Sequence, residues 1–327
     1  MIAMRMGVVA LATVVSLGVS ALGASTSALA ADKHVAITQI VEHPALDAVR
    51  KGVKDVLAES GYVEGKNLKW SFESAQGNVA TAAQIAKKFA GDAPDVIVAI
   101  ATPSAQTVIA STKTIPVVFS AVTDPVGAKL VSDPVHPGAN VTGVTDMTPI
   151  AAHMALVKRV VPNAKRLGVI SNPGEANSVS LVALIEAEAP KVGMSVVLAA
   201  ATKSGEVLAA ARSLVGKVDA IYIPTDNTVI SAFEAVVKVG NEASIPVLAG
   251  DTDSVKRGAV AAAGFDYYDV GRQTGKMVVK ILNGEKAGDM AVEGVAKTNL
   301  HLNMKAAAAQ GVTLSDKLIG EAENVIH

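Results

Sequence analysis

One pattern occurs twice in the chain, and this repetition restricts its fold more than any other feature. The first copy runs from Asp95 to Val118 and the second from Asp219 to Leu248. In each copy an Asp precedes an apolar run, hydroxyl residues and Pro open a helical segment, and Ile-Pro begins the next apolar run. Strands that are apolar throughout and alternate with helices are typical of parallel sheets covered on both faces. The repetition therefore predicts two similar α/β lobes of Rossmann type.

Further expected strands and helices surround each copy and complete the two lobes. Short β-branched runs, which predict strands, lie at 35–40, 68–72, 95–100, 116–119, 166–170, 195–198, 220–223 and 246–248. Segments with apolar residues at helical spacing lie between them, at 46–60, 79–90, 178–192 and 228–241. We expect one lobe to comprise residues 31–145 with about 251–283, and the other 146–250 with about 284–327. The hinge is expected near 141–146 and 249–251.

The composition excludes several classes of protein. Half of the residues are hydrophobic and 18% are charged, which excludes a disordered chain. The net charge is −1 and no basic run is visible, so the sequence offers no electrostatic drive for binding nucleic acid. The chain contains no cysteine, which excludes disulfides, thiol catalysis and a lipid-modified cysteine.

The N-terminal segment resembles a secretory signal peptide. Arg5 supplies the charge, an apolar run extends over 7–24, and the small residues Ala28 and Ala30 form an Ala-x-Ala site. We expect cleavage after Ala30, a mature chain that begins at Ala31, and a periplasmic protein without a lipid anchor. The alternative is a membrane anchor, but Ala, Gly, Ser and Thr dilute the hydrophobicity of the run.

Polar loops that follow the expected strands indicate where a ligand binds. In open parallel sheets ligands bind at the carboxyl ends of the strands, and two facing lobes bring these ends to one cleft. Thr102 and Ser104 open a helix, whose N-terminus favours a carboxylate. Asp226 and Asp251, on the opposite lobe, suit an ammonium group. The cleft is therefore expected to hold a zwitterion such as an amino acid, although each of these residues can equally be a helix cap.

The sequence gives little support to catalysis, a metal or a sugar ligand. The chain contains no G-x-G-x-x-G after the first strand, P-loop, G-x-S-x-G or H-E-x-x-H motif, and its six His residues lack paired spacing. Nothing places Asp124 near Asp226 or Asp251 as a carboxylate pair for glycoside hydrolysis. Aromatic residues, on which sugars stack, make up only 3% of the chain. Tyr267 and Tyr268 either pack their helix against its sheet or line the pocket. We expect no catalytic residues, no metal and no cofactor.

Six stretches in the same order resemble a known family over about residues 34–311. They are Ile37–Asp47, Ala101–Pro103, Ala121–Ala128, Asn172–Ser178, Pro224–Thr228 and Gly264–Tyr268. The chain resembles the ABC-transporter substrate-binding proteins of the tryptophan/tyrosine-binding type. The resemblance implies a type I periplasmic-binding fold, two lobes that close on a ligand, and delivery to a membrane permease. Carried over by motif, the expected ligand-binding residues are Glu42, Thr102, Ser104, Thr123, Asp124, Asn177, Ser178, Asp226, Asn227 and Asp251.

These observations predict a monomeric, non-catalytic binding protein of an ABC importer. Its expected ligand is a small zwitterion, an aromatic or branched-chain amino acid. Two alternatives stay open: a sensor that docks on a membrane receptor, and a binder of another metabolite such as a purine or a thiamin precursor. An exported hydrolase or transferase is a third possibility, distinguished by turnover of its ligand.

Overall fold

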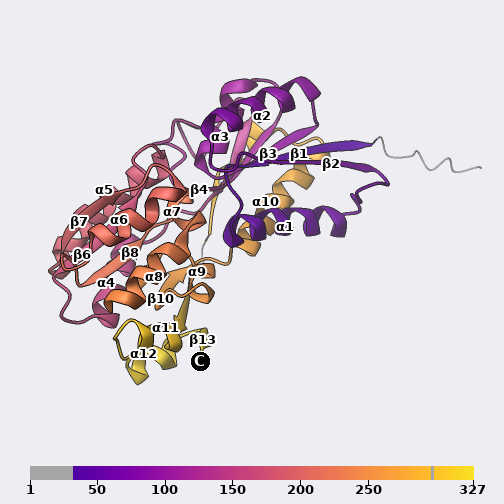
Figure 1. Cartoon of the computed structure of the whole chain (residues 1–327). Helices are drawn as coiled ribbons and strands as arrows, with labels where there is room; N and C mark the ends of the chain where they lie inside the picture. Colours follow the sequence, from indigo (N-terminus) through magenta and orange to yellow (C-terminus); the bar gives the residue numbers. More distant parts are fainter. Residues whose placement is uncertain (1–31, 296–297) are drawn as a thin grey trace, which may run out of the picture. The chain divides into compact units, whose positions relative to one another are not determined.

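The computed structural model describes residues 32–295 and 298–327. The expected signal peptide, residues 1–30, lies outside the described residues. Within the described part of the chain, no helix combines the length and the apolar character needed to cross a bilayer. The described residues form two α/β lobes, each built on its own sheet, as the repeated pattern predicts (Figure 1).

The first sheet has six strands in the order β11-β5-β4-β3-β1-β2, and all of its pairs are parallel. Its strands are β1 (Lys33–Gln39), β2 (Leu68–Ser74), β3 (Val96–Ile100), β4 (Val117–Val122), β5 (Val141–Thr145) and β11 (Glu293–Gly294). Its helices are α1 (Pro44–Glu59), α2 (Val79–Asp92), α3 (Thr102–Ser111), α10 (Tyr267–Leu282) and the short η3 (Ala287–Asp289). Helix α1 packs on α10 and α2 on α3, and Figure 1 shows the two pairs on opposite faces of the sheet. Because both faces are covered, β3 and β4 are buried along their whole length.

The second sheet has seven strands in the order β13-β12-β10-β9-β8-β6-β7. Its strands are β6 (Arg166–Ser171), β7 (Ser195–Ala200), β8 (Ala220–Ile223), β9 (Val247–Ala249), β10 (Ala261–Gly264), β12 (Asn299–Asn303) and β13 (Asn324–Ile326). Only β12 on β10 is antiparallel among these pairs. The helices are α4 (Ile150–Val160), α5 (Ala176–Glu188), η1 (Ala189–Val192), η2 (Ser204–Glu206), α6 (Val207–Ser213), α7 (Asn227–Ser231), α8 (Phe233–Ala243), α9 (Asp253–Lys256), α11 (Met304–Ala309) and α12 (Asp316–Glu321).

The repeated Asp of the sequence has the same role in both lobes. Asp95 Oδ2 accepts a hydrogen bond from the backbone N–H of His34 at 2.7 Å, and Asp219 Oδ2 accepts one from the N–H of Arg166 at 2.8 Å. Asp95 precedes β3 and binds the beginning of β1, which pairs with β3. Asp219 precedes β8 and binds the beginning of β6, which pairs with β8. The repeated sequence pattern therefore forms the same local structure in both lobes.

The chain crosses between the lobes at three places along the part that the structure describes. It crosses between β5 and α4, between β10 and α10, and between β11 and β12. The first crossing adjoins the hinge expected near 141–146. The second differs from the expectation, because 249–251 leads from β9 into α9 within one lobe, and the crossing follows Gly264.

The division of the sequence into lobes shifts accordingly. The sequence pattern places residues 251–264 in the first lobe, but β10 pairs with β9 and β12 in the second sheet. Residues 284–294 were assigned to the second lobe, but β11 pairs with β5 in the first. Strand β10 reads Ala-Ala-Ala-Gly, a sequence with no β-branched residue, so pattern alone does not reveal it.

Helices α1 and α10 of the first lobe cross at very close range, at Gly52 and Gly271. A Cβ atom on Gly52 would lie 2.3 Å from the backbone oxygen of Tyr268, and one on Gly271 would lie 2.1 Å from that of Val49. Only glycine allows α1 and α10 to approach so closely. This crossing positions His43 and Tyr267, which stand at the beginnings of the two helices.

Candidate ligand-binding site

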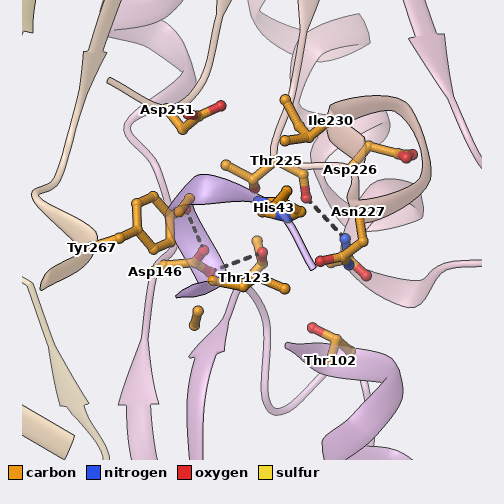
Figure 2. A pocket seen from close by; sticks show the side chains of 14 residues that line it. His43, Thr102, Thr123, Asp146, Thr225, Asp226, Asn227, Ile230, Asp251 and Tyr267 are labelled. Atoms are coloured by element: carbon orange, nitrogen blue, oxygen red, sulfur yellow. Dashed lines mark hydrogen bonds between the residues drawn. The ribbon is translucent and has the colours of Figure 1, made fainter. Parts of the chain in front are cut away.

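A pocket lies between the two lobes at the carboxyl ends of their strands (Figure 2). It encloses about 340 Å³ of empty space, including the part open to solvent. It is lined by His43, Ala45, Leu46, Thr102, Ala121, Thr123, Asp146, Asn177, Thr225, Asp226, Asn227, Ile230, Asp251 and Tyr267.

The topology explains why these residues meet. In the first sheet β1 lies between β2 and β3, and in the second β6 lies between β7 and β8, so the strand order reverses direction beside β1 and beside β6. Such a switch point leaves a crevice at the carboxyl ends of the strands. His43 follows β1 and Thr102 follows β3, while Asn177 follows β6 and Thr225 follows β8. Both crevices therefore open on the same pocket.

Four buried polar atoms in the pocket wall have no hydrogen-bond partner among the residues that the structure describes. They are His43 Nδ1, Thr102 Oγ1, Asn177 Oδ1 and Thr225 Oγ1. Buried polar atoms in native proteins are nearly always hydrogen-bonded, and an orphan is costly. Their concentration in one pocket indicates that a polar ligand satisfies them.

Helix N-termini surround this pocket. Helix α1 begins after His43 and α3 begins at Thr102, and neither has a side-chain hydrogen bond that caps it. Helix α7, in the second lobe, begins after Asp226, whose side chain caps it. The positive ends of α1 and α3 thus remain available to an anion, whereas that of α7 is neutralised by a carboxylate of the protein.

Asp226 is held rigidly in the second lobe. Its Oδ1 accepts from the N–H of Val229 at 2.8 Å, and its Oδ2 accepts from Ser178 Oγ at 2.6 Å and from the N–H of Asn172 at 2.5 Å. Burial and the neighbouring Glu175 carboxylate raise the pKa of Asp226. These bonds use most of its acceptor capacity.

Glu175 stabilises the same corner of the pocket. Its carboxylate accepts hydrogen bonds from the side-chain amides of Asn177 and Asn227 and from the N–H and hydroxyl of Thr228. It fixes both Asn side chains of the pocket wall, and sequence reasoning did not assign it this role.

A second group of polar residues comes from the crossings between the lobes and from the loop that follows β9. Asp146 accepts from Thr123 Oγ1 at 3.1 Å and from the Tyr267 hydroxyl at 2.7 Å (Figure 2). Asp251 accepts from the N–H and the hydroxyl of Ser254 at 2.8 and 2.7 Å. Burial raises the pKa of both carboxyl groups. Three buried carboxyl groups, Asp146, Asp226 and Asp251, therefore face a pocket to which the described residues contribute no Lys or Arg.

His43 contributes a neutral imidazole. Burial, and then the positive charge of Arg257, lower the pKa of His43 to about 3. At neutral pH its ring therefore has one donor and one acceptor nitrogen, and can satisfy either a carboxylate or an N–H group of a ligand.

Apolar side chains complete the wall. Ala45, Leu46, Ala121 and Ile230 line the pocket beside the polar residues. Ala121 has a positive φ of 52° where the register of β4 against β5 shifts. Bulges and strained backbone of this kind concentrate at functional sites.

Six of the ten residues expected from the sequence line the pocket. They are Thr102, Thr123, Asn177, Asp226, Asn227 and Asp251. The other four are not among its lining residues: Ser178 donates to Asp226, Ser104 is fully buried in α3, Glu42 is exposed and accepts from Gln76, and Asp124 accepts from Ser180.

Sequence reasoning missed several lining residues. Asp146 is expected only as the end of the hinge segment, and Thr225, in the stretch Pro224–Thr228 after an expected strand, is not among the ten expected ligand-binding residues. Tyr267 does line the pocket, one of the two roles left open for it. A carboxylate at a crossing between lobes gives no signal in sequence, because its neighbours come from distant segments.

A two-lobed α/β protein with such a pocket between its lobes belongs to the class of type I periplasmic binding proteins. More distant solved binding proteins, 15% to 18% identical, share this fold alone. The family of ABC transporter substrate binding proteins matches residues 34–326. The chain belongs to this family, as its motifs led us to expect.

Three relatives are informative. A curated "Tyrosine-binding protein" of Clostridioides difficile is 41% identical over 271 residues, which are 83% of this chain and 79% of the relative. A Streptococcus pneumoniae protein solved in complex with L-Trp is 36% identical, with a TM-score of 0.87 over 90% of this chain and 100% of that one. A ligand-free, open substrate binding protein from Clostridium difficile is 41% identical, with a TM-score of 0.67 over 90% and 99%.

Proposed function

We propose that this ABC transporter substrate-binding protein captures an aromatic amino acid between its lobes and releases it unaltered to a permease. The observation that carries the proposal is the set of orphan polar atoms in a pocket that has uncapped helix N-termini on one side and buried carboxyl groups on the other. Relatives that bind tyrosine or L-Trp support the same ligand class.

The two sides of the pocket suit the two charged groups of an amino acid. The ligand carboxylate lies at the first lobe, where the beginnings of α1 and α3 and the Thr102 hydroxyl can donate to it. The ammonium group lies near Asp146 or Asp251, whose carboxyl groups have fewer protein donors than that of Asp226. Leu46, Ile230 and the ring of Tyr267 contact the side chain.

The proposal differs from the sequence expectation in one respect. Asp226 was expected to share the ammonium role with Asp251, but its three hydrogen bonds within the lobe favour a positioning role. We therefore assign ammonium recognition to Asp251 and Asp146.

The location and state of the protein follow from the same proposal. The segment 1–30 directs export and is removed after Ala30, and the mature protein acts in the periplasm as a monomer. Binding without conversion requires only a pocket that closes and opens.

Calorimetric titration with amino acids tests the proposal. L-tryptophan, L-tyrosine and L-phenylalanine are titrated into the purified protein, with L-leucine, glucose and adenine as comparison ligands. We expect one molecule bound per chain, an aromatic amino acid bound at least tenfold more tightly than the comparison ligands, and ligand recovered unchanged by chromatography. Absence of amino-acid binding, or binding of adenine alone, contradicts the proposal, and conversion of the ligand contradicts the non-catalytic role.

A further inference from the structure

We propose that Asp124 and Ser180 form a latch that joins the two lobes and sets how long the ligand stays bound, without touching it. The inference rests on the proposed function and extends it to the regulation of the same site. Ser180 Oγ donates to Asp124 Oδ2 at 3.0 Å. Asp124 follows β4 in the first lobe, and Ser180 lies in α5 of the second.

This hydrogen bond is unusual because of where it lies. Of the hydrogen bonds among the described residues 32–295 and 298–327, it alone links the body of one lobe to that of the other, away from the crossings. Neither residue lines the pocket, and both are half-buried. The bond therefore reports the closeness of the lobes rather than contact with a ligand.

The Asp124 carboxylate is oriented toward α5 by its own turn. Its Oδ1 accepts from the N–H of Gly127 at 2.8 Å, and its backbone oxygen accepts from the N–H of Ala128 at 2.9 Å. A Cβ on residue 127 would lie 2.2 Å from Asp124 Oδ2, so glycine leaves the space that this carboxylate needs. Gln106 of α3 donates to the backbone oxygen of Ala128 and holds the turn on its lobe. Little conformational freedom remains to be lost when the bond to Ser180 forms.

In this structure the two lobes lie close enough together for the bond between Asp124 and Ser180 to form. Helix α3 of the first lobe contacts α5 of the second. The structure resembles the L-Trp complex, at 36% identity, more closely than the open ligand-free relative, at 41% identity. The two alignments have TM-scores of 0.87 and 0.67, respectively.

The latch acts on the equilibrium between open and closed states. A contact made only in the closed state stabilises it, and a ligand that binds this state is then released more slowly. Opening must break the bond, whereas encounter of the ligand with the open form does not involve it. The dissociation rate should therefore depend on the latch and the association rate should not.

Replacement of Ser180 tests this expectation by stopped-flow kinetics with L-tryptophan or L-tyrosine. In Ser180→Ala we expect dissociation to be five- to tenfold faster, which at tenfold corresponds to about 1.4 kcal/mol. We expect the association rate and the unfolding midpoint without ligand to be unchanged, since Ala suits a helix. Ser180→Thr keeps the hydroxyl and should restore slow dissociation.

The controls separate a latch from a general effect on the helix. Ser111→Ala removes a half-buried hydroxyl that bonds only within α3, and should not change dissociation. Asp124→Ala should speed dissociation in the wild type but add nothing to Ser180→Ala, because both changes remove the same bond. Equal dissociation rates in Ser180→Ala, Ser111→Ala and the wild type overturn the latch.

Failure of the proposed ligand is a separate outcome. If neither amino acid binds the wild type, the proposed function fails, and solution X-ray scattering of the ligand-free proteins then tests the latch. A larger radius of gyration for Ser180→Ala than for Ser111→Ala supports it, and equal values overturn it.

Discussion

The hydroxyl of Tyr267 donates to Asp146 Oδ2 at 2.7 Å, and this bond ties together two of the segments that connect the lobes. Asp146 follows β5, where the chain first leaves the first lobe, and Tyr267 begins α10, where it returns. Both residues line the pocket and are almost completely buried. The base of the cleft is thus fixed by a hydrogen bond between residues more than a hundred positions apart.

Tyr267→Phe should destabilise the protein. The change removes a donor and leaves the buried carboxyl of Asp146 with Thr123 as its remaining side-chain partner. We expect the free energy of unfolding to fall by about 1–3 kcal/mol, measured by urea titration. Tyr268→Phe is the matched control, because its hydroxyl donates to Asp55 outside the pocket, and it should cost less than about 1 kcal/mol. Equal losses for the two variants would contradict the structural importance of the bond.

Thr102→Val should weaken ligand binding without destabilising the fold. The Thr102 hydroxyl is buried and lacks a partner within the protein, and Val has the same shape without it. We expect aromatic amino-acid affinity to fall about tenfold, because a hydrogen bond to a charged ligand group is worth about 1.5–3 kcal/mol. The free energy of unfolding without ligand should stay the same or rise. Calorimetry and urea titration check the two parts, and unchanged affinity would place the ligand elsewhere.

Acidification should destabilise the protein partly through His153. Burial lowers the pKa of His153 to about 4, against about 6.5 in an unfolded chain. Between these two values the unfolded chain binds a proton that the folded chain does not, so stability falls as the pH falls. The slope from this residue approaches about 1.4 kcal/mol per pH unit.

The variant His153→Gln isolates this contribution. The Tyr222 hydroxyl bonds to His153 Nδ1 at 2.5 Å and can donate to the Gln side chain instead. His43, with a pKa lowered to about 3, adds a slope of the same sign, and Asp226, with a raised pKa, one of the opposite sign. We therefore compare slopes: urea titrations at pH 4.5 to 6.5 should show a smaller loss of stability in the variant, and an equal loss would disprove the assignment.

Gly271→Ala should separate α1 from α10. Its Cβ would lie 2.1 Å from the backbone oxygen of Val49, a contact that only backbone movement relieves. We expect a loss of at least about 2 kcal/mol in the free energy of unfolding. Gly91→Ala, in α2, is the control: nothing lies within 4 Å of the added atom, so it should stabilise by about 0.5–1 kcal/mol. A neutral Gly271→Ala would show that the helices do not need their close approach.

Local patterns in the sequence were sufficient to predict that the chain forms two α/β lobes, although not all of their boundaries. The two Asp-strand-helix copies fold as predicted because apolar runs must be buried on both faces and because an Asp at the same position caps the same neighbouring strand. Thr102 and Asp226 were found because they follow predicted strands at their carboxyl ends, where ligands bind in parallel sheets, and Asn177 was found because its stretch resembles the family.

The tertiary structure alone determined what the patterns leave open. Strand β10 has no β-branched residue, so its sequence does not predict a strand. Only its pairing with β9 and β12 shows that it belongs to the second sheet and that the second crossing follows it. Asp124 and Ser180 were placed together by the packing of two lobes, and Asp146 and Tyr267 by the meeting of two crossings. Periodicity along a chain records which residues are buried. It does not record which distant side chains meet, because that depends on the packing of whole elements.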